Sequence, residues 1–190
     1  MGLGAQFDRV LSAATAGGEW ALAALYRDLQ PAVLRYLYSQ HPGDAQDLAS
    51  ETWLDVARGL QRFDGDETAF RRWVFTIARR RLLDHRRATA RRRTDPVPAA
   101  SLEYLEAPDC ADEVMASASM RAAFARLASL PRDQAEVVVL RVLADLGVED
   151  VARIVGKRPG TVRVLQHRAL KRLAREHEAS RVTPRASEAM

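Results

Sequence analysis

The stretch VEDVARIVGKRPGTVRVLQH, residues 148–167, decides the fold of the C-terminal half. Ala152 is small enough for two helices to cross closely there, and Gly156, four residues later, suits a left-handed turn that a side chain would strain. Pro159 suits the first turn of a second helix, where no amide partner is lost. Val162 then supplies an apolar anchor beneath that second helix. The spacing predicts a helix-turn-helix.

The second helix of this motif carries basic and polar residues on its predicted outer side. A recognition helix enters the major groove with its N-terminal part toward the base edges, where Arg and Lys contact guanine or phosphate. A plain helical hairpin with a glycine turn would explain the spacing but not the basic face. We therefore predict DNA binding by the outward set, which is Gly160, Thr161, Arg163, Val164, His167, Arg168 and Lys171.

Composition favours an all-α chain of two small domains. The 190 residues are 47% apolar, carry a net charge of +4, and are rich in the helix formers Ala, Leu, Arg and Glu. Cys110 is the only cysteine, so an internal disulfide and a cysteine-rich metal site are excluded. Four scattered histidines favour ordinary surface or core positions, so neither a metal nor a cofactor is expected. With no signal peptide and no apolar run of membrane-spanning length, a cytoplasmic location is expected.

Apolar spacing and breaks in the pattern divide the chain. Helical spacing from Glu19 meets Pro31, which should mark a kink or the first turn of a new helix. Asp44 can cap a helix over 44–60, and another helix is expected over about 67–87. The β-branched run 137–140 has no partner strand nearby and is predicted to be helical. The predicted divisions are a disordered tail (1–18), a first domain (19–90), a flexible acidic linker (91–112), the helix-turn-helix domain (113–177) and a disordered tail (178–190).

Charge is segregated along the chain. Arginines crowd residues 79–93, a second basic run lies within residues 153–172, and acids gather between residues 44 and 55. In the 44–60 helix the acids fall at steps of three and four residues, opposite the apolar face. Basic patches beside an acidic one indicate one polyanionic partner and one protein partner.

Three blocks in this order resemble the extracytoplasmic-function (ECF) subfamily of the sigma-70 sigma factors. Residues 44–53 (DAQDLASETW) resemble its polymerase-binding helix, and residues 70–79 (FRRWVFTIAR) with 84–87 (DHRR) resemble its promoter-melting and −10 helix. Residues 130–169 resemble its −35-binding domain. The resemblance implies a sigma factor that binds core RNA polymerase and directs promoter-specific initiation through −10 and −35 elements. It also implies that an anti-sigma protein can be a partner.

The resemblance assigns roles to particular residues. The β′ clamp coiled coil of the polymerase would contact the acidic helix through Asp44, Asp47, Ser50, Glu51 and Asp55, and the β subunit would be a further contact. The −10 element would be held by Phe63, Asp64, Arg72, Arg79, Arg80, Asp84 and Arg87. Phe63 lies in the loop placed to take an extruded base, whereas Trp73 is expected in the core. The linker would either mimic nucleic acid inside the polymerase or serve as a flexible spacer.

Three positions depart from the family pattern. Ser50 stands where the family often has Gln, and Arg80 where it often has Asn, a change that bears on −10 base preference. Leu165-Gln166 replaces the usual Arg-Leu pair and shifts the inward face of the recognition helix by one position. The base contacts of that helix therefore differ from the family pattern.

Other function classes explain fewer features. A stand-alone regulator that binds an operator as a dimer through its helix-turn-helix leaves the arginine-rich segment 71–93 and the acidic linker without a role. An RNA-binding adaptor accounts for less still. An enzyme has no support, because the sequence has no paired carboxylates in a pocket-like context, no nucleophile motif and no phosphate loop.

Overall fold

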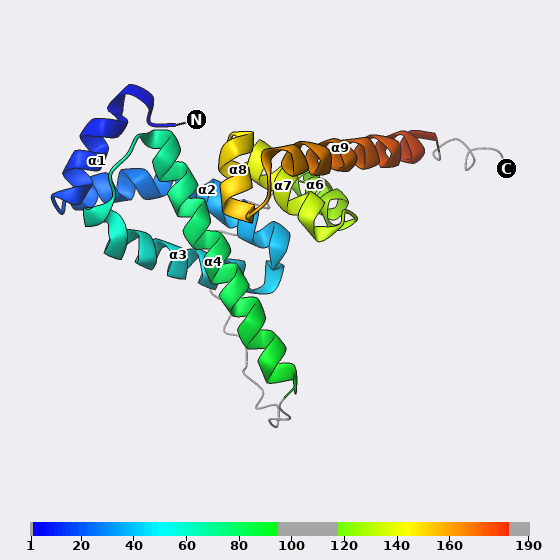
Figure 1. Cartoon of the computed structure of the whole chain (residues 1–190), viewed down its shortest axis with the longest axis horizontal. Coiled ribbons are helices and arrows are strands. Elements are labelled where there is room, and N and C mark those ends of the chain that lie inside the picture. Colours follow the sequence, from blue (N-terminus) through cyan, green and yellow to red (C-terminus); the bar gives the residue numbers. More distant parts are fainter. Residues whose placement is uncertain (1, 95–117, 183–190) are drawn as a thin grey trace.

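The computed structural model describes residues 2–94 and 118–182, and within those ranges the secondary structure is helical (Figure 1). The predicted acidic linker lies mostly outside the described residues. The predicted all-α class with two helical domains is confirmed. The helices are η1 (Gly4–Gln6), α1 (Phe7–Thr15), α2 (Glu19–Gln40), η2 (Pro42–Asp44), α3 (Ala45–Gly59), η3 (Leu60–Arg62), α4 (Glu67–Thr94), α6 (Ala118–Ala128), α7 (Arg132–Val142), α8 (Val148–Val155) and α9 (Pro159–Val182).

The N-terminal tail is not disordered, contrary to prediction. Residues 7–15 form α1, and Phe7, Val10 and Ala14 are buried against the core. Their spacing of three and four residues puts all three on one helical face. The Phe7 ring packs against Phe70 of α4, with 5.7 Å between ring centroids. The first domain therefore begins before residue 19.

Pro31 lies inside α2, which is one helix from Glu19 to Gln40. Of the two predicted alternatives, a kink or the first turn of a new helix, the second is wrong. Pro31 is exposed, as is Arg27 one turn earlier, so water can reach the backbone carbonyl that the missing amide leaves without its helical partner. Buried α2 residues pack between α3, α4 and α1.

Two helices extend beyond the ends predicted for their domains. The α4 helix continues through residue 94, so the first four residues of the predicted linker are helical. The α9 helix continues to Val182, so residues 178–182 are not a disordered tail. In both segments good helix formers extend a helix beyond its buried part.

The C-terminal half confirms the predicted motif. The run 137–140 is helical and buried within α7. Gly156 ends α8 with φ 67°, in the left-handed region, and Pro159 is the first residue of α9. Ala152 and Val162 are buried where α8 crosses α9.

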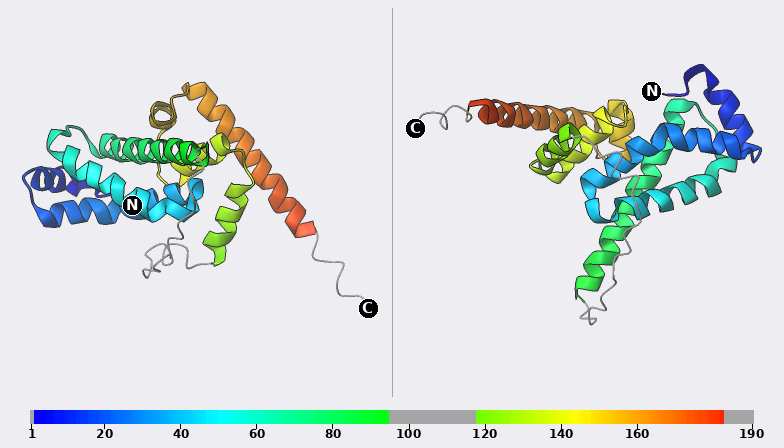
Figure 2. Two further views of the ribbon diagram at one scale, coloured as in Figure 1. Left: turned by 90° about the horizontal axis from the view of Figure 1, so that it is seen from below. Right: turned by 180° about the vertical axis from the view of Figure 1, so that it is seen from behind.

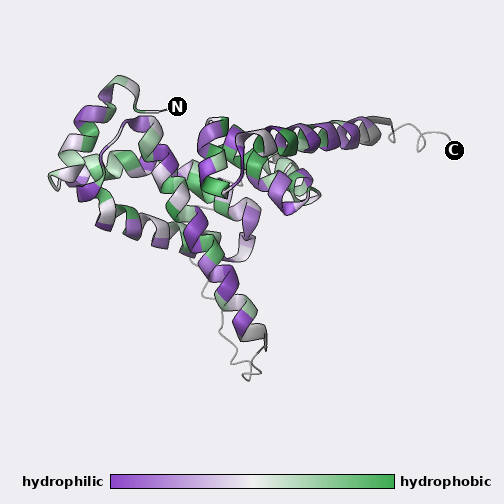
Figure 3. Cartoon of the chain, viewed as in Figure 1, coloured by the Kyte–Doolittle hydropathy of each residue, from purple (hydrophilic) through white to green (hydrophobic). Residues whose placement is uncertain are grey.

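The two halves pack against each other. α2 contacts α7 and α6, and α4 contacts α8, so the α7–α8 pair lies beside α2 and α4 (Figures 1 and 2). Buried apolar residues of both halves belong to one continuous cluster. The distal ends of α4 and α9 project from this body, with hydrophilic residues recurring along both (Figure 3).

Candidate nucleic-acid and polymerase interfaces

The recognition helix α9 exposes all seven residues predicted from sequence to face outward, from Gly160 to Lys171. Val162 and Ala169 are fully buried on the opposite side. Arg163 Nη2 lies 3.0 Å from Glu149 Oε1 of α8, and both side chains are largely exposed, so this surface ion pair holds the arginine only weakly.

The pair Leu165-Gln166 faces the domain rather than solvent. Leu165 is half-buried against the core, and the Gln166 side-chain oxygen accepts a hydrogen bond from Arg141 at 3.3 Å. The departure from the family pattern thus places an apolar residue and an amide at the flank of the helix. Val164 remains exposed at 47% on the outer face.

The arginines predicted to hold the −10 element fall into two groups. Arg80 and Arg87 are exposed on α4, and Asp84 lies between them at 3.9 Å and 2.9 Å. Arg72 and Arg79 instead form ion pairs with carboxylates of the C-terminal half. The structure therefore presents only part of the predicted set to solvent.

Phe63 is half-buried rather than free in its loop. Its ring stacks on Trp73 with 5.0 Å between centroids and meets Phe70 edge-on at 5.3 Å. Trp73 packs on the core as predicted. Asp64 is exposed beside Phe63, while Asp66 caps α4 by accepting the Ala69 amide at 2.7 Å.

The outer stripe of α3 combines charge with an apolar residue that sequence reasoning missed. Asp47, Ser50 and Glu51 are exposed as predicted. Leu54, one turn after Glu51 on the same stripe, is 56% exposed although it is a large hydrophobic side chain. The signal was in the spacing, because positions 47, 50, 51 and 54 share one helical face. Leu54 therefore adds a solvent-exposed apolar side chain to the acidic stripe.

Asp55, at the edge of this stripe, is tied to α4. The Arg81 Nε donates to Asp55 Oδ2 at 2.6 Å, and Arg81 also lies 3.3 Å from Glu51. The hydrogen bond from Arg81 holds the pKa of the Asp55 carboxyl below its usual value, against a smaller opposing effect of burial. Asp55 therefore contributes to the α3–α4 contact.

Asp44 occupies the N-cap position of α3 but makes no side-chain capping hydrogen bond. One of its carboxylate oxygens lies 2.8 Å from His41 Nδ1 and 3.3 Å from His85 Nε2. These three residues are the one group in the described part of the chain that could hold a metal ion. All three side chains are partly exposed, and the Asp44 carboxylate lies between the two imidazoles.

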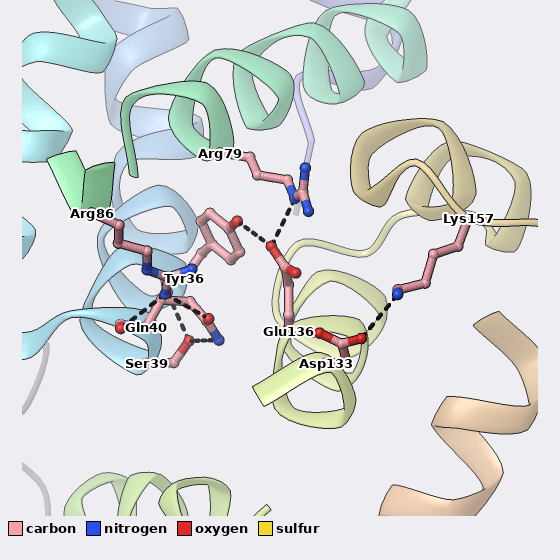
Figure 4. A network of polar contacts seen from close by, with 8 residues as sticks. All are labelled: Tyr36, Ser39, Gln40, Arg79, Arg86, Asp133, Glu136 and Lys157. Carbon is pink, nitrogen blue, oxygen red and sulfur yellow. Dashed lines mark hydrogen bonds and ion pairs between the residues drawn. The ribbon is translucent and has the colours of Figure 1, made fainter. Parts of the chain in front are cut away.

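A buried polar network that the sequence did not predict joins the two halves (Figure 4). Glu136 of α7 is 6% exposed and accepts hydrogen bonds from Tyr36 Oη and Arg79 Nε, both at 2.9 Å. Burial, and then the charge of Glu136, raises the pKa of the Tyr36 hydroxyl well above its usual value. In the sequence, the one indication of this network is that Glu136 stands among apolar residues of α7, where a buried acid requires a polar partner.

Comparison with known proteins identifies the family. The family model described as Sigma-70 region 2 matches residues 25–92, and that described as Sigma-70, region 4 matches residues 121–173. The ECF RNA polymerase sigma factor ShbA of Streptomyces griseus is 39% identical over 171 residues, which cover 84% of this chain and 89% of that protein. The chain is an ECF sigma factor of the sigma-70 family. Accordingly, it directs promoter-specific transcription initiation by RNA polymerase, and the stand-alone regulator is not favoured.

Two solved structures share the fold of this sigma factor. CnrH in complex with the cytosolic domain of CnrY matches with a TM-score of 0.61 and 18% identity, over 90% of this chain and 96% of that one. The sigma factor RpoE in complex with the anti-sigma factor NepR, from Bartonella quintana, matches with a TM-score of 0.54 and 22% identity, over 78% and 93%. The α1–α4 half is called region 2 below, and the α6–α9 half region 4. Among the described helices, none is long and apolar enough to span a membrane.

Proposed function

We propose that region 2 of this sigma factor docks on the β′ clamp coiled coil of core polymerase through the outer stripe of α3. Asp47, Ser50 and Glu51 supply polar contacts, and Leu54 supplies the apolar anchor at their centre. The exposure of Leu54 is the observation that carries this assignment. Asp44 and Asp55, which are engaged within region 2, act mainly by holding α3 against its neighbours.

The two DNA elements are divided between the regions. The −10 element is held by α4 and by the loop before it, where cationic side chains bind the melted strand. The loop contributes Phe63 and Asp64, and α4 contributes Arg72, Arg79, Arg80, Asp84 and Arg87. The outer face of α9 reads the −35 element, with Arg163, His167 and Arg168 toward bases or phosphates. Asp84 positions Arg80 and Arg87 through its two ion pairs. The protein's contribution is recognition and positioning rather than catalysis, and it acts in the cytoplasm. An anti-sigma protein is a candidate regulator.

Polymerase docking is tested by Leu54→Glu and by the double charge reversal Asp47→Lys with Glu51→Lys. Both should weaken binding to core polymerase by about tenfold or more. The loss of an apolar side chain that the complex buries, or the reversal of interface charges, costs on the order of 1–3 kcal/mol. Since these side chains are exposed, the circular dichroism spectrum should not change. Affinity is measured by fluorescence titration of labelled protein with core enzyme.

The matched control is Trp20→Glu, which changes another large apolar residue that is 56% exposed but belongs to α2 rather than to α3. This variant should keep the parent affinity. Parent-like affinity in both α3 variants would show that polymerase docks elsewhere.

A further inference from the structure

Region 4 covers part of the −10 face of region 2 in this structure. Glu136 of α7 enters between α2 and α4, where it accepts from Tyr36 and Arg79 (Figure 4). Arg79 is one of the arginines assigned to the −10 strand. A carboxylate thus stands where a DNA phosphate would bind, with the charge and the acceptor oxygens that a guanidinium requires.

A second acid makes the same kind of contact about two turns earlier along α4. Asp150 of α8 is 8% exposed and its Oδ1 lies 2.9 Å from Arg72 Nη1. Arg71 donates to the Ala144 carbonyl oxygen at 3.5 Å, which brings a backbone acceptor to the same face. Ile154 of α8 also lines the shallow groove that contains Arg79, Arg80 and Arg87. The contact therefore follows the −10 face over two turns.

While the two regions are packed in this way, the protein cannot contact both promoter elements at once. Elements centred near −10 and −35 are about 25 base pairs apart, or about 85 Å along B-form DNA. In the structure α4 packs on α8, and α8 packs on α9. Packed helix axes are about 10 Å apart, so the two DNA faces lie within roughly 20 Å of each other where these helices cross.

We propose that region 4 acts as an intramolecular competitor of −10 DNA, with Glu136 and Asp150 occupying the arginines that otherwise bind the strand. The docking surface is the α2–α4 face of region 2, and its occupant is the α7–α8 pair of the same chain. This inference rests on the proposed assignment of α4 to the −10 element. Binding to both elements requires the pair to leave that face.

The chemistry of the contact suits a surface that opens. A carboxylate in a permanent core is costly, whereas Glu136 would be hydrated on α7 once region 4 moves away. Interfaces between domains that separate are more polar than cores for this reason. The 23 residues from 95 to 117 connect the two regions, and a chain of that length reaches at most about 80 Å. That reach, added to the width of the two regions themselves, is enough for elements about 85 Å apart.

The test neutralises the acids of region 4 and leaves the arginines intact, since replacing an arginine would remove the DNA contact as well. The full-length double variant Glu136→Gln with Asp150→Asn is titrated, without polymerase, against a labelled single-stranded oligonucleotide carrying the −10 region of a promoter that the holoenzyme transcribes. Affinity should rise about tenfold or more over the parent, because a larger fraction of molecules presents a competent face.

The matched control is Asp133→Asn with Glu149→Gln. It removes the same charge from the same two helices, but its acids pair with Lys157 and Arg163 inside region 4. This control should keep the parent affinity. A second variant, Tyr36→Phe, removes the hydroxyl that donates to Glu136 from the region 2 side, and its affinity for the oligonucleotide should rise less. This variant tests the same contact if the double variant misfolds. Parent affinity in every folded variant, or an equal rise in the control, overturns the proposal.

Binding of the −10 strand by the holoenzyme distinguishes a failure of the competition by region 4 from a failure of the −10 assignment. Bound to core polymerase, all variants should hold the −10 strand with parent affinity, because polymerase already keeps the regions apart. If no holoenzyme binds that strand through α4, the −10 assignment is at fault. If the holoenzymes bind normally and the free variants show no gain, only the competition by region 4 is overturned.

Discussion

Replacing Val162 by Asp is expected to unfold region 4 and to abolish transcription that depends on the −35 element. Val162 is fully buried where α9 crosses α8. An unpaired carboxylate there costs on the order of 4 kcal/mol, a large share of the stability of a small domain. Far-ultraviolet circular dichroism should show lost helix, and run-off transcription from a −35-dependent promoter should disappear.

The neighbouring substitution Val164→Asp provides the control for that result. Val164 lies on the same helix but is 47% exposed, on the face assigned to DNA. This variant should keep the parent melting temperature while it weakens −35 binding, because the new carboxylate faces phosphates. Equal loss of helix in both variants would show that burial does not explain the effect, and a stable Val162→Asp protein would contradict the packing of the motif.

The second large effect concerns promoter opening, which the free protein should not achieve. Breaking base stacking costs about 1.4 kcal/mol per step, so a transcription bubble costs on the order of 10 kcal/mol. The free chain has little surface to offset this cost, and Arg72 and Arg79 are engaged by region 4. With core polymerase, which supplies a channel for the strands, the same DNA should open.

Permanganate footprinting measures this difference directly. Thymines near the start site should react only when protein and core polymerase are both present, and protein alone should bind the duplex weakly. Tight binding by the protein alone at a palindromic site, without thymine reactivity, would favour a dimeric regulator.

Features set by local spacing were predictable from the sequence. The turn at Gly156, the first turn of α9 at Pro159 and the burial of Val162 follow from steric limits and period, which neighbouring residues determine. The acidic stripe of α3 followed in the same way. The exposure of Leu54 follows from the same spacing, because Leu54 shares the helical face of Asp47 and Glu51. An apolar residue on a helix is otherwise expected to lie in the core.

Features set by distant partners were not predictable. Tyr36 and Glu136 are 100 residues apart in sequence, and nothing local to either residue indicates the other. The same holds for Arg72 and Asp150, which are 78 residues apart in sequence. The sequence predicted a DNA contact for Arg72 and gave no indication of this acidic partner. The α1 helix was missed for another reason, because glycines on either side of its short apolar pattern suggested a loose tail.

The distance between region 2 and region 4 should differ between the free protein and the holoenzyme on a promoter, and energy transfer measures that distance. Donor and acceptor dyes would be attached at Ala23→Cys on α2 and Ala174→Cys on α9, in a Cys110→Ser background. Both positions are exposed, and Ala174 lies one turn beyond Lys171, the last residue of α9 assigned to DNA. High energy transfer is expected in the free protein, where the regions are packed together. In the holoenzyme bound to promoter DNA, energy transfer should fall strongly as the regions separate to reach elements about 85 Å apart. Equally high energy transfer in a holoenzyme complex that initiates transcription from that promoter would contradict the account.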